Sequence, residues 1–498
     1  MDYLLIKNHE TVSLSSIPVL EYENFLEQNT ALLGEERRHC VNYYGFPQRG
    51  KVQLICCIAD DADGTILVSS AWAKKDKMLP SFTARRTAFH NFEREIHENF
   101  GIAYADHPWL KPLRFPFNRA NAQNDIANYP FFRIGSEELH EVGVGPIHAG
   151  VIEPGHFRFI CNGEQILHLE IQLGFQHRGI ESLFLKKKKL LQRNVLAESI
   201  AGDMVAGHTA AFANLWESLC GFHPGADLQF ARTLALELER IAVHTGDLSA
   251  LCTDVAYQLG SAVFGRLRTP LINYFQIWCG NRFAKGLIRA GGTHFPFNEI
   301  LAKQLRKLLD EFEPDFDDMC EETFTLPSLL ARFEKTGVVT HDQASAIGTV
   351  GMAARVSSLK RDIRASHPHD FYPALNHQPI VKHHGDVYSR AQLRRREIKQ
   401  SIGYVRQMLE QMPRENTTRP PLRQPAAESF TLSLTEGWRG EICHCAITDD
   451  RGDPAHYKVK DPSFHNWLAL ALAVRNNEIS DFPVCNKSFD LSYCGHDL

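Results

Sequence analysis

The chain has 498 residues, of which 44% are hydrophobic and 23% charged, and its formal net charge is −5. This is the composition of a folded globular protein long enough for two or three domains. Because no strong basic balance exists, nucleic acid is excluded as the main partner. The first residues lack the basic region and long apolar core of a signal peptide, and the apolar runs are too short to span a bilayer. We therefore expect any membrane association to come through partner proteins.

The twelve cysteines are scattered, and no two of them form a CxxC pair. The closest pairs, Cys56–Cys57 and Cys443–Cys445, do not have the spacing of a structural zinc site. We expect free thiols, as in a cytosolic protein. The sequence also contains no P-loop, no GxGxxG after a strand and no GxSxG elbow.

Residues 1–116 predict a small α+β domain. The runs VQLICCI (52–58) and TILVSSA (65–71) are typical of two strands joined by a turn-rich loop. The segment 84–100 has phenylalanine and isoleucine side chains three to four positions apart, which indicates an amphipathic helix. Gly101 is expected to end this helix.

The next segment, 117–140, is rich in asparagine and predicts a linker, and a second domain is expected over 141–498. That domain opens with Phe157 to Leu173, an alternating pattern around Asn162-Gly163 that predicts a β-hairpin. Two histidines precede the hairpin and the charged run QHRGIE follows it. This combination indicates either a functional site or a surface hairpin with solvated charges.

From Val195 to Ile288 the pattern becomes strongly helical. Glu237, Arg240 and His244 share one face of a helix, where they could form a buried, salt-bridged surface. Four lysines at 186–189 indicate a solvated helix face, or a docking patch for an acidic partner. Further helices are expected at 299–313, 341–364, 389–412 and 462–475, with a proline- and arginine-rich loop at 413–427. The predicted fold class is α+β: a small N-terminal α+β domain followed by a mainly α-helical bundle with peripheral β-hairpins.

Several blocks carry a resemblance to a known family. The second domain resembles the large catalytic subunit of energy-converting nickel–iron hydrogenases of the formate hydrogenlyase and hydrogenase-4 type, and its relative, the quinone-site subunit of respiratory complex I (NADH-quinone oxidoreductase). The first domain, with FEREIHENFGIAYADHPWLKPLRFP, is similar to the small complex I subunit that docks beside it, and the two are fused in some relatives. The matching blocks, in the family's order, are GPIHAGVIEPGHFRF, HRGIESL, LALELERIAVHTGDL, GTVGMAARVSSLKRDIRASHPHDFY, GDVYSRAQLRRREIKQSI, EGWRGE and DPSFHNWLALALAVRNN.

The chain departs from the hydrogenase pattern at the metal ligands. A nickel–iron centre needs four cysteine thiolates, which the family supplies as two CxxC pairs. Here Ala201 and Met204 occupy the first pair of positions, Ser492 and Gly495 occupy the second pair, and Cys494 stands one residue out of place. The resemblance therefore predicts the hydrogenase scaffold without nickel, and no tightly bound cofactor on this chain.

Residues around that centre match the family's functional positions. Glu181 matches the glutamate that relays protons, and Arg439 matches an arginine that faces the metal cavity. Arg178 matches the arginine beside the [4Fe–4S] cluster of a neighbouring subunit, and His148 resembles the histidine that hydrogen-bonds a quinone. The tyrosine that shares the quinone has no counterpart between 195 and 219, where Gly202 lies near its position. Each charged residue could instead form a structural ion pair.

The resemblance implies an electron-transfer and proton-coupling subunit of a membrane-bound oxidoreductase complex, acting on a quinone or another acceptor. Its expected partners are a small iron–sulfur subunit and antiporter-like membrane subunits. Its expected location is the cytoplasmic face of the inner (cell) membrane, and the isolated chain is expected to be inactive. The alternatives are a catalytically dead scaffold of the same complex and an active hydrogenase, which the missing thiolates disfavour.

Overall fold

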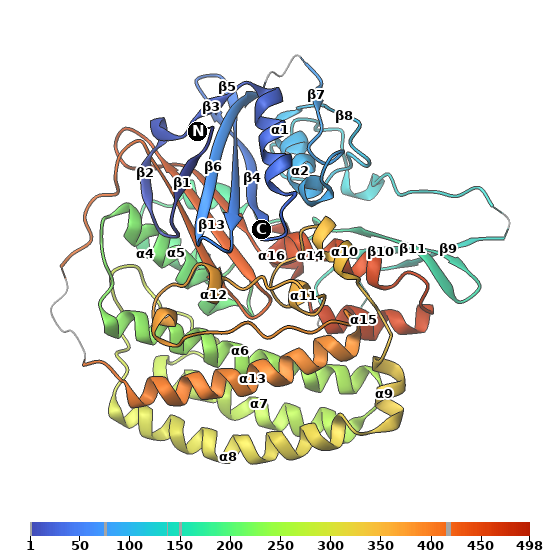
Figure 1. Ribbon diagram of the computed structural model, residues 1–498, viewed down its shortest axis with the longest axis vertical. Helices are drawn as coiled ribbons and strands as arrows, with labels where there is room; N and C mark the ends of the chain where they lie inside the picture. Colours follow the sequence, from blue (N-terminus) through green and yellow to red (C-terminus); the bar gives the residue numbers. More distant parts are fainter. Residues whose placement is uncertain (1, 74–76, 137, 149–151, 415–419) are drawn as a thin grey trace.

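A computed structural model describes residues 2–73, 77–136, 138–148, 152–414 and 420–498. Figure 1 shows that the N-terminal sheet, drawn in blue, lies at one end of the molecule. A layer of long helices, drawn in green, yellow and orange, forms the opposite end. The C-terminal sheet and the short C-terminal helices lie between these two layers.

The N-terminal layer is an antiparallel sheet in the order β1-β6-β5-β4, with β3 added parallel to β6. The strands expected at 52–58 and 65–71 are confirmed as β5 and β6. The helix expected at 84–100 begins later, at His90, after a short 3-10 turn, and Gly101 ends it with a φ of 73°. The elements are β1 (Leu4–Ile6), β2 (Thr11–Ser13), β3 (Val19–Leu20), α1 (Tyr22–Leu32), β4 (Arg38–Gln48), β5 (Lys51–Asp60), β6 (Thr65–Ala73), β7 (Leu79–Pro80), α2 (His90–Phe100) and β8 (Tyr104–Ala105).

The predicted hairpin is confirmed. β10 (His156–Asn162) and β11 (Gln165–Gln172) pair antiparallel, and β9 (His140–Val144) adds a third strand on the other side of β10. Gly163 adopts a φ of 56° in the connecting turn, a conformation that glycine tolerates without strain. The hairpin leads directly to α3, whose first turn carries Glu181.

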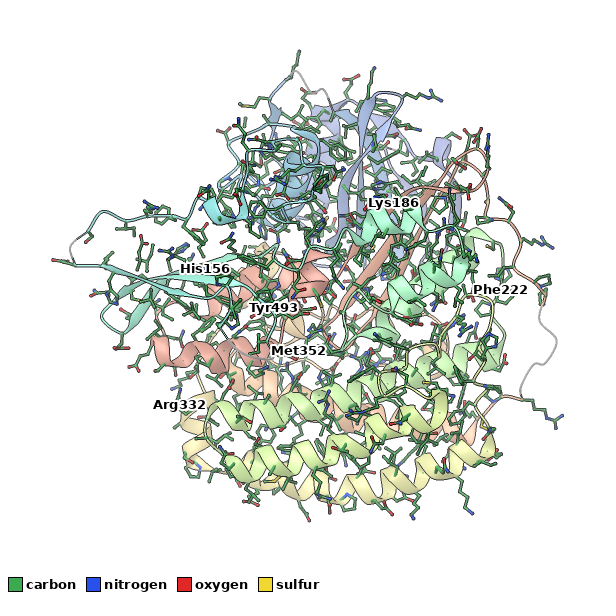
Figure 2. All side chains as sticks on the ribbon, turned by 180° about the vertical axis from the view of Figure 1, so that it is seen from behind. His156, Lys186, Phe222, Arg332, Met352 and Tyr493 are labelled. Atoms are coloured by element: carbon green, nitrogen blue, oxygen red, sulfur yellow. The ribbon has the colours of Figure 1, made fainter. Side chains whose placement is uncertain are left out.

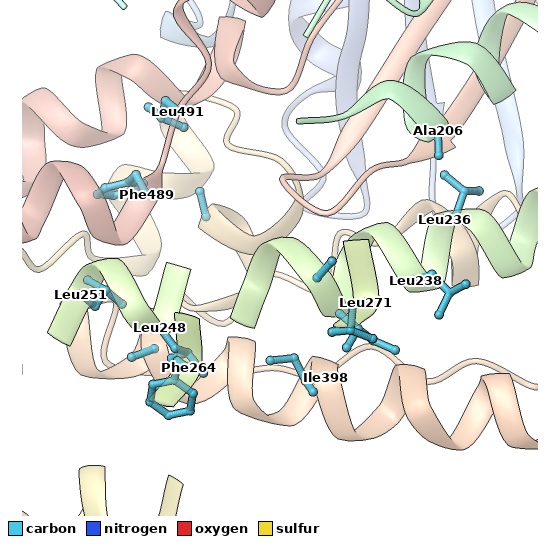
Figure 3. Close-up of a cluster of buried hydrophobic side chains, with 14 of the residues drawn as sticks. Ala206, Leu236, Leu238, Leu248, Leu251, Phe264, Leu271, Ile398, Phe489 and Leu491 are labelled. Carbon is cyan, nitrogen blue, oxygen red and sulfur yellow. The ribbon is translucent and has the colours of Figure 1, made fainter. Parts of the chain in front are cut away.

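The helical layer is confirmed as a bundle. α6 packs against both α7 and α13, and α8 packs against α7. Figure 3 shows their shared core, where Leu248 of α6 lies beside Phe264 of α7, and Leu271 of α7 lies near Leu238 of α6 and Ile398 of α13. The helices are α3 (Ile180–Lys186), α4 (Leu190–Ala197), α5 (Val205–Leu219), α6 (Ala226–Asp254), α7 (Gln258–Cys279), α8 (Glu299–Thr323), α9 (Pro327–Phe333) and α13 (Val387–Glu410). Among the described residues, no helix combines the length and apolar character needed to cross a membrane.

The single helix expected at 341–364 is wrong. The segment forms three short helices, α10 (His341–Ala346), α11 (Gly351–Arg355) and α12 (Ile363–Ser366). Gly348 and Gly351 have φ values of 72° and 61°, which break the right-handed helix. Gly351 also lies so close to Gly440 that an added Cβ would stand 2.1 Å from the Gly440 Cα. The break therefore lets a second loop approach this backbone.

The C-terminal part contains a sheet that the periodicity did not indicate. β12 (Ser429–Glu436), β13 (Glu441–Thr448) and β14 (Pro454–Lys460) form it with β2 of the N-terminal part, in the order β14-β13-β12-β2. The sheet is followed by α14 (Ser463–Ala473), which confirms the helix expected at 462–475, and by α15 (Phe482–Phe489) and α16 (Tyr493–Asp497). The division into 1–116, 117–140 and 141–498 stays a prediction, although its first and last parts share this sheet.

His39 of β4 also joins the two sheets. Its buried imidazole lies 2.6 Å from Glu441 Oε2 and 3.3 Å from Asp61 Oδ2. Burial alone favours the neutral ring, but the two carboxylates raise the pKa of His39 to about 9. Because this folded pKa lies above the unfolded value of 6.5, the protonated ring stabilises the fold fully below pH 6.5. That stabilisation is lost as the pH rises through about 9.

We therefore expect the difference in unfolding free energy between the wild-type chain and His39→Gln to shrink by about 3 kcal/mol from pH 6 to pH 9.5. Chemical unfolding of both proteins across this range measures the difference. An equal pH dependence in the two proteins would show that the imidazole does not hold a proton in the folded state.

Candidate functional site

The two segments that resemble the nickel-ligand regions lie side by side in the structure. Ala201 and Met204, from the loop before α5, form one buried apolar cluster with Cys494, Trp438 and Ile442. The side chains of Ala201 and Met204 are fully buried in it. Apolar packing therefore fills the position of the first CxxC pair.

The second pair of positions also lacks metal ligands. The Ser492 hydroxyl accepts a hydrogen bond from the Gly495 N–H at 2.9 Å and so caps α16. A Cβ at position 495 would stand 2.6 Å from Oδ2 of Asp461, so a cysteine there requires Asp461 to move. Burial raises the pKa of Cys494 to about 12, which keeps this thiol protonated.

These donors do not fit a nickel–iron centre, which requires soft thiolates at all four positions. Across the described residues, no group of three or more histidine, cysteine, aspartate and glutamate side chains is arranged to hold a metal ion. No chemical step in this site is therefore assigned to nickel.

Arg439 lies on the turn between β12 and β13 and is almost fully buried. Its guanidinium donates two hydrogen bonds to the Asp203 carboxylate, at 2.8 and 2.5 Å, and stacks 3.9 Å from the Trp438 ring centroid. It also donates to the Asp490 carbonyl. Burial opposes the charge, but Asp203 raises the pKa of Arg439 above its usual range. Arg439 therefore stays charged and ties the loop at 201–204 to the C-terminal segment.

The bundle holds this turn in place. Arg240 of α6 donates hydrogen bonds to the carbonyls of Glu436 and Gly437, at 2.9 and 3.2 Å. Gly437 and Gly440 close the turn through two backbone hydrogen bonds. The stripe of Glu237, Arg240 and His244 is thus confirmed as a buried, salt-bridged face.

Glu181 lies in a cluster of charges whose other members are buried, while 25% of its own side chain is exposed. Lys458 of β14 contributes its ammonium at 2.9 Å, and the Val459 N–H donates to the same carboxylate oxygen at 3.0 Å. Burial favours the neutral carboxyl, but Lys458 and then Arg114 lower the pKa of Glu181 overall. Lys458 and Arg114 both also pair with Glu95 of α2, so the N-terminal part completes the cluster.

A cavity of about 240 Å³ opens beside this cluster. Residues from both parts of the chain line it, including Glu95, Arg114, His177, Glu181, His456 and Tyr457. The cavity gives Glu181 a space in which water or a polar ligand fits. Sequence reasoning missed Glu95, Arg114 and Lys458, and the only signal was the density of charge in FEREIHENF and YKVKD.

Arg178 is exposed but fixed. Its guanidinium donates to the carbonyls of Ser199, Ile200 and Cys494, at 2.5, 2.9 and 3.0 Å. These carbonyls belong to the two segments that replace the ligand regions. Arg178 therefore joins the two segments and places a positive charge on the outer side of the site.

His148 lies apart from the Glu181 cluster. Its ring packs near Phe157 and Tyr493, with ring centroids 5.5 and 6.2 Å away. Nε2 of His148 has no hydrogen-bond partner among the described residues, and burial lowers the pKa of this imidazole. Tyr493 also lies close to Gly155 at the base of the hairpin, and Figure 2 shows it near His156. Sequence reasoning sought a tyrosine between 195 and 219 and missed Tyr493, because 345 positions separate it from His148.

The class of protein follows from these features. The chain has an α+β fold in which Arg439 lies on a buried turn and Glu181 follows the HRG motif. The two segments at the nickel-ligand positions, 201–204 and 492–495, lie side by side. This is the architecture of hydrogenase and complex I large subunits. Residues 258–497 match the family described as respiratory-chain NADH dehydrogenase, 49 Kd subunit. Together with a hydrogenase relative at 30% identity over 70% of the chain, this match shows that the chain belongs to the family of hydrogenase and complex I large subunits, which confirms the resemblance and the fold class.

Three relatives illustrate the match. Carbon monoxide-induced hydrogenase of Rhodospirillum rubrum is 30% identical over 353 residues, covering 70% of this chain and 97% of its own. Hydrogenase-4 component G of Escherichia coli (strain K12) is 25% identical over 512 residues, covering 97% and 86%. A fused NADH-quinone oxidoreductase subunit of Phocaeicola vulgatus is 25% identical over 466 residues, covering 85% and 88%.

Proposed function

We propose that the chain is an electron-transfer and proton-coupling subunit of a membrane-bound oxidoreductase complex related to complex I and to hydrogenases. It has no nickel–iron centre of its own. The observation that carries the proposal is a contrast between two parts of the site. Buried apolar packing fills positions 201 and 204, and Asp461 lies against position 495. Glu181, in contrast, remains an ionisable carboxylate beside a cavity.

The exposed side of Arg178 is where we place a small iron–sulfur subunit. A fixed positive charge there stabilises the reduced form of a [4Fe–4S] cluster in that partner and so raises its reduction potential. Antiporter-like membrane subunits complete the assembly, which holds the chain on the cytoplasmic face of the membrane. Because this chain carries no redox cofactor in the proposal, it is inactive in isolation.

The acceptor is a quinone or a molecule of similar chemistry. The pair of His148 and Tyr493 supports this assignment, because an imidazole whose Nε2 has no partner within the described part of the chain and a nearby phenol suit the two carbonyl oxygens of a quinone. Histidine can both donate a hydrogen bond and pass a proton near neutral pH.

A second candidate function is that of a catalytically dead scaffold. The closed ion pair between Arg439 and Asp203 favours it, because paired charges also occur where they only fix structure. The two candidates differ in whether Glu181 must titrate, and a Glu181 variant therefore separates them.

Metal content tests the proposal against the third alternative, an active hydrogenase. We expect the complex, purified from cells grown with added nickel, to contain far less than one nickel per chain. Elemental analysis measures the ratio, with a cysteine-bearing hydrogenase of the same family purified in parallel as the control. About one nickel per chain would overturn the proposal.

A further inference from the structure

A chain of four buried side chains leads inward from the cavity beside Glu181. It begins at Tyr457, which lines the cavity and whose hydroxyl lies 2.8 Å from Nδ1 of His444. Nε2 of His444 lies 3.1 Å from Nδ1 of His208, and Nε2 of His208 lies 3.0 Å from Oδ2 of Asp461. All four side chains are at most 1% exposed. The chain is therefore continuous and shielded from bulk water.

The hydrogen positions along these four side chains follow from Asp461 at the inner end. Asp461 can only accept, because burial favours the neutral acid but His208 and Arg439 lower its pKa overall. With neutral imidazoles, Nε2 of His208 must carry a hydrogen, and its Nδ1 must accept. Nε2 of His444 then donates to that Nδ1, and the Tyr457 hydroxyl donates to Nδ1 of His444. Every donor points toward Asp461.

We propose that Tyr457, His444 and His208 form a proton relay between the cavity beside Glu181 and Asp461. The inference rests on the proposed function and deepens it by assigning the path of the coupled proton. These three are relay residues, and Glu181 remains the proton carrier at the cavity.

The transfer balances without any change of oxidation state. The Tyr457 O–H bond breaks as an N–H bond forms at Nδ1 of His444, whose Nε2 proton passes to Nδ1 of His208. The Nε2 proton of His208 passes to Oδ2 of Asp461. Tyr457 recovers a proton from the cavity. One proton thus moves inward, and the reverse sequence moves it outward.

The inner end of the relay lies at the core of the site. Asp461 Oδ2 faces Gly495, one of the positions that replace the metal ligands, and Arg439 contributes positive charge nearby. Among the described residues, the charged or titratable groups that act on the two ends of the relay are Arg193 and the thiols of Cys443 and Cys445 at Tyr457, and Arg439 at Asp461. Burial and the neighbouring His208 hold the pKa of His444 well below its usual range, so this ring passes a proton without retaining it.

The alternative is a hydrogen-bonded network that only satisfies buried polar groups. Tyr457→Phe separates the two roles, since it removes one hydroxyl and keeps the ring stacked on Phe184, whose centroid is 4.1 Å away. The matched control is Tyr274→Phe. Tyr274 is equally buried and donates to the Leu301 carbonyl at 2.9 Å, away from the site.

The experiment uses the intact complex reduced at an electrode, with proton uptake followed by a pH indicator in H₂O and in D₂O. We expect Tyr457→Phe to slow proton uptake at least about tenfold and to change its solvent isotope effect, while Tyr274→Phe stays within about twofold of wild type. His444→Gln, which keeps hydrogen bonding but cannot relay a proton, should reproduce the loss.

Each outcome decides one point. If Tyr457→Phe and His444→Gln take up protons like wild type while Glu181→Gln does not, the relay is wrong and the proposed function stands. If all three behave like wild type, both are wrong.

Nitrogen-15 NMR of the histidine-labelled wild-type chain gives a test that needs no variant. Before any transfer, with Asp461 ionised, we expect the ring hydrogen of His208 and of His444 on Nε2, and a hydrogen on Nδ1 of either neutral ring in that state would overturn the relay.

Discussion

Glu181→Gln is expected to leave the complex assembled and to lower its turnover at least about tenfold. The amide keeps the size of the carboxyl and can still accept the hydrogen bond from the Val459 N–H, but it cannot exchange a proton. If Glu181 carries the coupled proton, electron transfer stalls when the charge that arrives cannot be compensated. Turnover of the purified complex and the set of proteins that it contains measure the two properties separately.

The charges around Glu181 explain how it could titrate. Lys458 is shared between Glu181 and Glu95, at 2.9 Å from the Glu181 oxygen. A proton that arrives at one carboxylate changes the attraction felt by the other, since both depend on the same ammonium. Such a shared cation couples a protonation change to the charge of the surroundings, which a surface carboxylate would not do.

The matched control is Glu198→Gln. Glu198 is buried and, like Glu181, hydrogen-bonded, to the Asn194 amide at 3.1 Å and the Gly286 N–H at 2.9 Å, but it does not line the Glu181 cavity. Turnover of this variant should stay close to wild type. Wild-type turnover in Glu181→Gln would favour the scaffold. Loss of assembly in that variant would instead assign Glu181 a structural role.

Alternation between two environments made the hairpin predictable, whereas β5 and β6 were predicted from short apolar runs beside a turn-rich loop, although nearly every residue in them is buried. The hairpin at Phe157 to Leu173 has one face against the core, and α8 buries one stripe of side chains. β13 could not be recognised in this way, because every residue of Glu441–Thr448 is buried and the period of two disappears. The break inside 341–364 depended on two glycines with positive φ, and the sequence alone does not reveal the conformation that a glycine adopts.

The candidate site was only partly predictable for a different reason. Local motifs identified Glu181, Arg178 and Arg439, but the groups that control their charge come from distant segments. Lys458 lies 277 positions from Glu181, and Asp203 lies 236 positions from Arg439. Burial in a shared interior makes these pairings favourable, and a motif read along the chain contains no information about them.

The second large effect is expected from Arg364→Leu, which should destabilise the folded chain by about 3–5 kcal/mol. Arg364 lies in a fully buried network between the helical bundle and the turn between β12 and β13 that carries Arg439. Its guanidinium binds Asp362 at 2.8 Å, Glu397 at 3.0 Å and Glu237 at 3.5 Å. Arg355 neutralises Glu397, Asp362 and Glu436 in the same network. Arg240 also pairs with Glu237 and Glu397, so removing Arg364 takes one of three arginines from this buried network.

The cost arises from desolvation more than from a lost attraction. A carboxylate buried without sufficient positive charge suffers the penalty of leaving water, and it can escape only by taking up a proton or by opening the fold. Burial favours the neutral acid, but Arg364, His377 and Arg355 together hold the pKa of Asp362 well below its usual range, and Arg364 has the largest effect of the three. Without Arg364 that pKa must rise, so the variant should be least stable at neutral and alkaline pH and regain part of its stability in acid.

Arg266→Met is the matched control. Arg266 pairs with Asp315 at 2.5 Å, but the two side chains are 62% and 49% exposed, so water screens their charges. We expect this variant to lie within about 0.5 kcal/mol of wild type. Chemical unfolding of the three proteins at pH 5 and pH 8 gives the comparison. Two results would contradict this prediction: an equal loss of unfolding free energy in Arg364→Leu and Arg266→Met, or a loss in Arg364→Leu that does not depend on pH. Either would mean that the buried network does not govern the stability of the turn between β12 and β13.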